Sequence, residues 1–531
     1  MSRSGPTDRR AHALSGALAT TSSLGVAMLS RVALLKWWED IRSSYWFIPT
    51  LMAVGAIALS IGAVFVDSRI GADWLEAVPW LYENRPAGAR DLLSTIAGSM
   101  ITVAGVTFSI TIAAVAYAAS QFGPRLLTNF MGDRGNQVTL GVFIATFLYC
   151  LLVLRTIRDG SEVAAGTPLD ATEAAAHTAF VPHSAILVAL ALAVLSVGVL
   201  IYFIHHVPQS IHVSNVIAAV GRDLIEGIDR AFPEADASRE EGSTASGPGP
   251  REAADRDTAE GNEADPVYTD DADPAYTYEA DPAPADAVLI DARRTGYVQR
   301  IDDDGPAEIA EEHDLVVRLV VRPGDFVRAG QPLVYAWPAD GVTEDTADRL
   351  RGAFAFGDRR THAQDIVFLV NELAEISSRA LSQGVNDPFT ASACVDWLGA
   401  AGVRLAERPT PELRRLGPSG QVRLFLRPLT FRDFLAEGFG RIRPYAASDV
   451  NACLHQLASL AGMAAQVPEG DCRLAVLEEA RALAADAHRR LEGAGDRRRV
   501  AARLRALEDL IEGRATVAAL AWRHRWFLGR A

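Results

Sequence analysis

The sequence predicts a membrane α-helical protein with four transmembrane helices, joined to a second half that mixes α-helices and β-strands. Three observations lead to this fold class. The apolar stretches of the 531-residue chain are concentrated in its first 210 positions. From Ala287 apolar and polar residues alternate, which is typical of strands. From Thr343 to the C-terminus apolar residues recur with helical spacing.

Changes in composition divide the chain into five parts. Residues 1–45 form an N-terminal segment with an interfacial helix, 46–232 the transmembrane domain with its exit helix, 233–286 an acidic disordered linker, 287–340 a β module, and 341–531 a mostly helical domain. We expect the first part and the last three to lie in the cytoplasm.

Four segments are long and apolar enough to cross the hydrocarbon core of a bilayer, which is about 30 Å thick. They are Trp46–Val66, Ser94–Ser120, Val138–Ile157 and Pro182–Ile204. Arginine is more frequent near the span ends on the side that would also hold both termini. Because cytoplasmic loops retain positive residues, we expect a multi-pass protein of the plasma membrane (the bacterial inner membrane) with both termini cytoplasmic.

The second span differs from the others because it carries no charge and is rich in small and hydroxylated residues. These recur at helical spacing on one face: Ser94, Gly98, Thr102, Gly105 and Ser109, followed by Ala116 and Ser120. The opposite stripe is bulkier and consists of Ile96, Val103, Ile110 and Tyr117. The small face could line a pore, or it could seal helix–helix contacts, where small residues let backbones approach closely.

Two arginines, Arg125 and Arg134, follow the second span in a short loop. They belong to a positively charged loop that we place on the cytoplasmic side. If several subunits surround a pore lined by the second spans, these arginines lie at its inner mouth and favour anions.

The formal charge of −15 comes almost entirely from the linker. Between Glu234 and Asp286 there are 16 acidic and 3 basic residues. Such a segment buries too little apolar surface to fold and is extended by its own charge. The folded parts show neither a basic stripe with aromatic residues nor a nucleic-acid-binding motif, so we expect no nucleic-acid partner.

The β module resembles the barrel-sandwich modules of biotinyl and lipoyl carriers. It has Gly296 and Val298 in one strand, a Gly-Asp-x-Val motif at 324–327 and a Gly-x-x-Leu motif at 330–333. We expect turns at Gly324 and Gly330. Carriers attach their cofactor to a lysine at an exposed hairpin, and this module has no lysine. We therefore expect a rigid structural unit without a cofactor.

The helical domain contains a cluster of side chains that could bind a ligand: Arg359, Arg360, Asp365, Arg379, Asn386 and Asp387. The alternative is that these residues form ion pairs and helix caps. Asp387 followed by Pro388 is typical of a helix start, with Asp387 as the N-cap. Farther along we expect a strand at Gln421–Leu429 and helices at Ser448–Gln466, Arg473–Leu491 and Arg498–Glu512.

The sequence offers no catalytic site. The four cysteines have no paired spacing, and no triad, P-loop or His-Asp metal motif is present. The interiors of the second to fourth spans lack the ionisable residues typical of membrane hydrolases and proton relays. We therefore expect neither enzyme activity nor a metal or cofactor site.

Three blocks resemble a family of bacterial predicted membrane proteins that is catalogued only as a domain of unknown function. The blocks are residues 96–155, the sequence RPGDFVRAGQPL at 322–333, and residues 357–391. The resemblance covers most of the chain from about Trp46 to Leu510, and the acidic linker is the departure from it. It implies a four-span membrane half with a cytoplasmic half, and it implies no activity or functional residue.

Two functions fit these observations. The first is an oligomeric ion or small-solute channel with a cytoplasmic regulatory half, whose partners would be membrane lipid, further copies of the chain, and the ion or solute. The second is a membrane-anchored sensor or scaffold that binds a ligand or partner through its cytoplasmic half.

Overall fold

The computed structural model describes residues 41, 44–70, 86–122, 133–158, 180–233, 283–302, 304–409 and 413–516. These residues form two compact units. The first, the membrane unit, draws its described residues from 37–220 and 375–393, and the second draws them from 221–374 and 394–531. Residues 234–282 of the predicted acidic linker lie outside the described residues, as does the predicted N-terminal interfacial helix.

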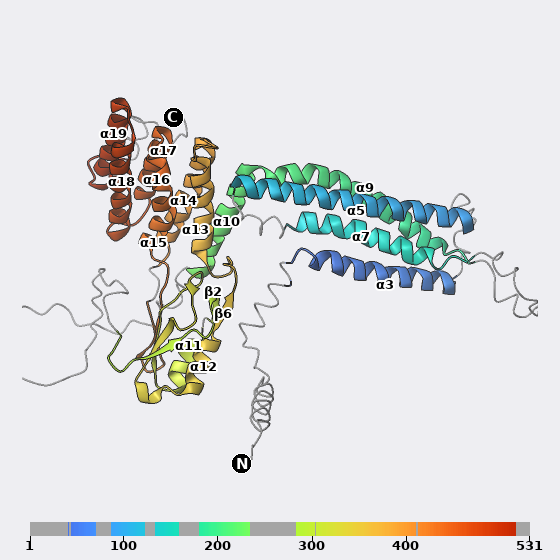
Figure 1. The fold of residues 1–531 in the computed structure, drawn as a ribbon, viewed down its shortest axis with the longest axis horizontal. Helices are drawn as coiled ribbons and strands as arrows, with labels where there is room; N and C mark the ends of the chain where they lie inside the picture. The colour runs from blue at the N-terminus through green and yellow to red at the C-terminus, as the bar shows by residue number, and fades with distance from the viewer. Residues whose placement is uncertain are drawn as a thin grey trace, which may run out of the picture. The chain divides into compact units, whose positions relative to one another are not determined.

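The four predicted spans are helices: α3 (Phe47–Ile70), α5 (Pro86–Phe122), α7 (Arg134–Leu154) and α9 (His183–Ile211). They lie side by side (Figure 1), and each is long and apolar enough to cross a membrane. The second helix has 37 residues and begins earlier than predicted, at Pro86. Proline is well tolerated at the first position of a helix, where its missing N–H breaks no bond.

α7 is the central helix of the bundle, because it packs against α3, α5 and α9. In the most apolar stretch of α7, 50% of the residues are buried, compared with 17–22% in the corresponding stretches of the other three helices. Gly141 allows the close approach of α3, since a Cβ at this position would lie 2.6 Å from a methionine sulfur of that helix. On the side of α9, the hydroxyl of Tyr149 donates to the carbonyl of Ala185 at 3.0 Å.

The carboxylate of Asp67, near the end of α3, caps the first turn of α9. It accepts hydrogen bonds from the backbone N–H groups of Ser184 and Ala185, each at 3.0 Å. An acidic side chain at a helix N-terminus satisfies free N–H groups and interacts favourably with the helix dipole. The one acidic residue of α3 thereby fixes the end of one span to the start of another.

The β module of the second unit is built on two open sheets, of strand order β1-β5-β3-β8-β7 and β4-β2-β6. The strands are β1 (Val288–Asp291), β2 (Gly296–Ile301), β3 (Val316–Leu319), β4 (Phe326–Val327), β5 (Pro332–Trp337), β6 (Phe354–Gly357), β7 (Arg414–Leu416) and β8 (Val422–Phe425). β3 and β8 are parallel, and the other neighbours are antiparallel.

The sheets extend beyond residue 340, where we predicted the module to end. β6 joins the smaller sheet, and β8 pairs with β3, so that Val317 lies opposite Leu424 in one shared core. Without β8, one edge of β3 would present unpaired backbone groups. Between β2 and β3 lies the short helix α11 (Gly305–Glu312), and α12 (Glu344–Gly352) follows β5.

The other helices of the described residues are α10 (Val213–Ala231), α13 (Ile366–Ala380), α14 (Pro388–Ala406), α15 (Phe431–Leu435), α16 (Arg441–Ala446), α17 (Val450–Ala464), α18 (Asp471–Arg490) and α19 (Ala494–Ile511). The helices predicted at 448–466, 473–491 and 498–512 correspond to α17, α18 and α19 to within four residues. α17, α18 and α19 pack against one another. The fold class is therefore confirmed as four membrane helices, a mixed β region and a helical C-terminal region.

Two glycine turns predicted in the β module have positive φ angles, 95° at Gly324 and 86° at Gly330. They differ in their surroundings. A Cβ at Gly324 would lie 2.2 Å from Oδ2 of Asp365, whereas nothing lies within 4 Å of a Cβ at Gly330. Asp365 is 2% exposed and forms an ion pair with Arg360, so the turn at Gly324 packs against a buried charged pair.

A buried carboxylate also lies in the C-terminal helices. Oε2 of Glu479, on α18, accepts a hydrogen bond from Arg443 at 2.7 Å. Oε1 has no hydrogen-bond partner among the described residues. Burial raises the pKa of Glu479 to about 7, although Arg443 acts in the opposite direction.

We expect Gly324→Ala to destabilise the protein more than Gly330→Ala. Both substitutions place a Cβ on a backbone with positive φ, which costs about 1–2 kcal/mol. At Gly324 the Cβ also displaces the Asp365 carboxylate, so the free energy of unfolding should fall by a further ~1–3 kcal/mol. Thermal unfolding of the two full-length variants in detergent checks this, and equal shifts in midpoint would contradict it.

We expect Glu479→Gln to change how stability depends on pH. The pKa of Glu479 rises from 4.5 to about 7 on folding, so the folded state binds more protons between these values. The wild type therefore loses stability as pH rises from about 4.5 to 7, by up to about 3 kcal/mol, relative to a variant that cannot ionise.

Unfolding midpoints of wild type and Glu479→Gln at pH 5, 6, 7 and 8 measure this difference. Glu478→Gln is the matched control, because its side chain is 63% exposed on the same helix. A difference between wild type and Glu479→Gln that stays constant across this range would show that burial does not control this carboxyl.

Candidate functional site

The hydroxyl-rich face of α5 is not covered by other described helices of the chain. Its residues are Ser94, Gly98, Thr102, Gly105 and Ser109, and all five are exposed. Nothing lies within 4 Å of a Cβ built on Gly98 or Gly105. We call these five residues the small face of α5.

α5 packs against α7 and α9 through a different set of side chains. Its buried positions include Leu93, Ala97, Met100, Ala104, Thr107 and Thr111. The bulky stripe that we predicted opposite the small face is in part exposed, with Ile110 at 47% and Tyr117 at 59%. The face of α5 that packs against α7 therefore lies beside the bulky stripe on the circumference of the helix and does not coincide with it. Alanine and threonine on the packed face permit a closer approach to α7 than isoleucine and tyrosine would.

The hydroxyl groups of the small face are partly satisfied within their own helix. The side chains of Thr102 and Ser109 donate to the carbonyls of Gly98 and Gly105, each at 2.8 Å. Each hydroxyl thus uses its only donor, while lone pairs remain available to a further donor. Such a face suits a second helix or water better than it suits lipid tails.

Of the two predicted basic residues, Arg125 lies outside the described residues. Arg134 is the first residue of α7 and is exposed. The preceding residue, Asp133, caps α7 by accepting from the N–H of Gly135 at 2.7 Å, and it also pairs with His206 of α9 at 2.8 Å. An acidic group therefore accompanies Arg134 at this end of the bundle.

Arg360 and Asp365, from the predicted ligand cluster, form a bidentate ion pair. The guanidinium Nε and Nη2 lie 2.7 Å and 3.0 Å from the two carboxylate oxygens. Asp365 also accepts from the N–H of Phe368 at the start of α13. Burial raises the pKa of Asp365, and Arg360 opposes this shift. The side chain of Arg359 is exposed, while its carbonyl accepts from Gln299 at 2.6 Å.

The other predicted ligand residues lie in the loop between α13 and α14. Asp387 is the N-cap of α14, as predicted, and accepts from the N–H groups of Phe389 and Thr390, each at 3.1 Å. The hydrogen bond from the Thr390 hydroxyl is the main reason that the pKa of Asp387 is lowered. Arg379 pairs with Glu375 at 3.0 Å, and Asn386 has a positive φ of 51°. These contacts are caps and ion pairs.

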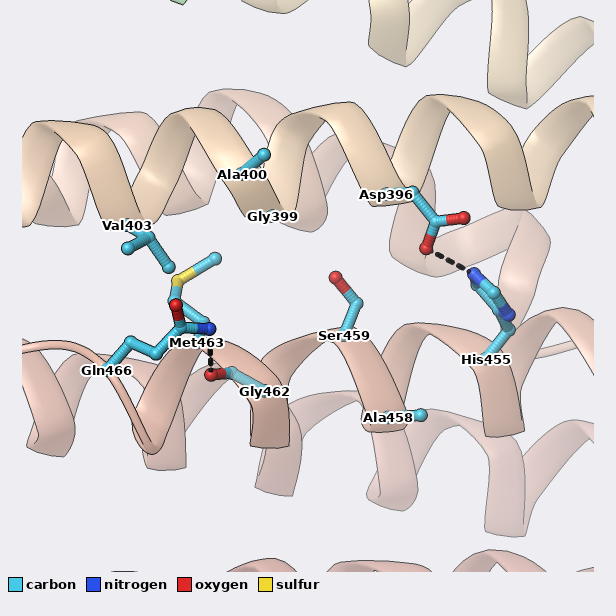
Figure 2. A pocket seen from close by; sticks show the side chains of 10 residues that line it. All are labelled: Asp396, Gly399, Ala400, Val403, His455, Ala458, Ser459, Gly462, Met463 and Gln466. Atoms are coloured by element: carbon cyan, nitrogen blue, oxygen red, sulfur yellow. Dashed lines mark hydrogen bonds and ion pairs between the residues drawn. The ribbon is translucent and has the colours of Figure 1, made fainter. Parts of the chain in front are cut away.

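A groove of about 520 Å³ lies between α14 and α17. Figure 2 shows a hydrogen bond at one end, between Asp396 Oδ1 and His455 Nε2 at 2.7 Å, and Gln466 at the other end. Ser459 lies between them, and its hydroxyl donates to the carbonyl of Val395 at 3.3 Å. The rest of the lining is small or apolar and consists of Gly399, Ala400, Val403, Ala458, Gly462 and Met463.

The groove can hold a small molecule or an apolar side chain against its walls, with polar groups at its two ends. Sequence reasoning missed it. Asp396 and His455 are 59 positions apart and lie on helices that we predicted without predicting how they pack. No motif marks either residue.

The described residues contain no group of three or more histidine, cysteine, aspartate or glutamate side chains that could hold a metal ion. Cys150, Cys394 and Cys453 are buried free thiols, and Cys472 is partly exposed. In the second unit, burial raises the pKa of Cys453 to about 12 and raises that of Cys394 further. Both thiols are therefore protonated and unreactive at neutral pH.

The chain is similar to uncharacterized proteins of two mycobacteria. It is 29% identical over 491 residues to one from Mycobacterium bovis and to one from Mycobacterium tuberculosis strain H37Rv. Each alignment covers 90% of this chain and 83% of the relative. No solved structure shows significant similarity to the chain.

A family model described as "Predicted membrane protein (DUF2254)" matches residues 42–462, which include the whole membrane bundle, the β module and most of the helical region. The match thus takes in all three sequence blocks that carried the predicted resemblance. We conclude that the chain belongs to the DUF2254 family of predicted membrane proteins.

Proposed function

We propose that this membrane protein assembles as a homo-oligomer and conducts ions or small solutes along an axis surrounded by the small faces of α5. The observation that carries this proposal is the exposure of that face in the isolated chain. α5 carries there the small and hydroxylated groups that permit close packing or contact with water, and no other helix of the described residues packs against them.

The surroundings of the small face support this choice. Neighbouring positions on α5 expose large apolar side chains, with Val106 at 55%, Phe108 at 45% and Ile110 at 47%. These side chains suit lipid, whereas glycine gains little from lipid and lets two helices approach closely. A symmetric ring of copies would place the small faces inward and the bulky neighbours outward.

In this proposal the protein lies in the bacterial inner membrane with both termini in the cytoplasm. Arg125 and Arg134 then flank the inner mouth, so chloride should pass more readily than potassium. The acidic neighbour of Arg134 weakens this preference, because it offsets part of the positive potential.

A second candidate function is that of a sensor or scaffold, and the groove between α14 and α17 supports it. The groove offers the volume and the mixed polar and apolar lining of a small-molecule site. The two functions are compatible, since ligand binding in the second unit could regulate conduction.

We expect Gly105→Leu to disrupt assembly and Gly198→Leu to leave it intact. Both glycines are exposed on membrane helices, and nothing lies within 4 Å of a Cβ at either position. Only Gly105 belongs to the small face, so the added side chain there should raise the dissociation constant of the oligomer at least about tenfold, which corresponds to ~1.4 kcal/mol.

Mass photometry of the wild type and both variants in detergent or nanodiscs measures this effect. A wild type that is monomeric at all concentrations, or a Gly105→Leu variant that assembles as well as Gly198→Leu, would contradict assembly through the small face.

We expect purified protein in liposomes to give a flux of chloride that can be blocked at Ser109. In a Cys472→Ser background, which leaves three buried cysteines, Ser109→Cys and Leu195→Cys each introduce one exposed thiol. A negatively charged methanethiosulfonate should stop flux at position 109, because the adduct occupies the passage. Leu195, which is 56% exposed on α9, is the lipid-facing control.

If vesicles with wild-type protein show no flux of chloride, potassium or a small neutral solute, the channel proposal fails. In that case the groove becomes the leading site of function. Equal block at positions 109 and 195 would also contradict the proposed path.

A further inference from the structure

The loop between α13 and α14 presents two apolar side chains to its surroundings. Phe389 is 84% exposed, which makes it the most exposed large apolar residue in the described part of the chain. Val385, four residues earlier, is 49% exposed. An exposed phenylalanine forgoes the favourable transfer of its ring out of water, and an apolar environment around the loop would supply it.

This loop is held in one conformation by its own backbone. The N–H groups of Val385 and Asn386 donate to the carbonyl of Ser382 at 3.1 Å and 2.9 Å, and that of Asp387 donates to Ala380 at 2.8 Å. The Asp387 carboxylate caps the next helix through Phe389 and Thr390. The backbone groups that would be costly to place in an apolar environment are therefore already paired.

The loop is also almost free of charge. From Ala380 to Ser392 the only charged residue is Asp387, and its carboxylate accepts hydrogen bonds from two N–H groups and one hydroxyl. The nearest preceding charge, Arg379, is paired with Glu375. The tip can thus leave bulk water without exposing an uncompensated ion to lipid.

The location of the loop indicates what covers it. Residues 375–393 belong to the same compact unit as the four membrane helices. The chain leaves the fourth span at Ile211, and α10 starts at Val213, so the first turns of α10 lie at the end of a membrane helix. The loop therefore belongs to the unit that holds the four membrane helices.

From these observations we propose that the tip of the α13–α14 loop inserts Val385 and Phe389 into the interfacial region of the bilayer that holds the four spans. Aromatic and aliphatic side chains partition into this region and anchor the elements that carry them. This inference does not depend on the proposed channel.

Fluorescence quenching by labelled lipids tests the insertion in the full-length protein. Phe389→Cys is made in the Cys472→Ser background, labelled with the environment-sensitive dye NBD and reconstituted into phosphatidylcholine vesicles. Vesicles that also contain lipids with a nitroxide near the headgroup report proximity to the interface. Leu416→Cys is the control, since Leu416 is 63% exposed on β7 of the second unit.

Insertion predicts blue-shifted NBD emission at position 389 and quenching several times stronger than at position 416. Val385→Cys should behave like Phe389→Cys. Equal quenching at 389 and 416 would overturn the proposal. So would an NBD signal at 389 that changes with the protein-to-lipid ratio and not with the nitroxide lipid, because that result would place a second copy of the chain over the tip.

Discussion

The arrangement of the membrane unit depends on one helix, α7, which is packed on three sides. Because α3, α5 and α9 all use α7 as their partner, each of them buries one side and exposes the rest. α3 and α9 expose large apolar side chains, such as Leu51 at 62% and Val194 at 68%, and these suit lipid. α5 exposes glycines and hydroxyls on its small face. The outer surface of the bundle therefore has two kinds of region, the large apolar side chains of α3 and α9 and the small, hydroxylated face of α5. This difference is the physical basis of the proposed assembly.

Polar groups inside both units are fixed by close pairing. Asp67 caps α9, Asp365 is held by Arg360 beside the turn at Gly324, and Glu479 receives one hydrogen bond from Arg443. Asp67 and Glu479 join elements that are far apart in sequence, whereas Asp365 pairs with an arginine five positions away. Burial makes such groups costly unless they are paired. They therefore specify which elements meet, in addition to the apolar core.

The sequence predicted the parts of this fold that depend on local pattern. Four spans follow from apolar length, the start of α14 follows from Asp387 and Pro388, and the turns at Gly324 and Gly330 follow from glycine in a strand-rich context. These features need only neighbouring residues, so one sequence suffices to predict them.

The sequence did not predict features that depend on packing between distant elements. The pairing of β8 with β3 joins residues more than one hundred positions apart, and the groove with Asp396 and His455 arises where α14 meets α17. The packed side of α5 was also missed, because alanines and threonines that pack and glycines and serines that stay exposed have similar hydropathy. In the predicted ligand cluster, Asp365 and Asp387 form the ion pair and helix cap that the sequence offered as the alternative, and ligand binding stays a prediction.

The central claim is that the small face of α5 is covered by other copies of the chain around a shared axis. A cryo-electron microscopy map of the full-length protein in lipid nanodiscs tests it most directly. The account predicts a closed ring of copies with Ser94, Thr102 and Ser109 facing a hydrated axis. A single copy whose α5 small face is covered by ordered lipid would contradict it.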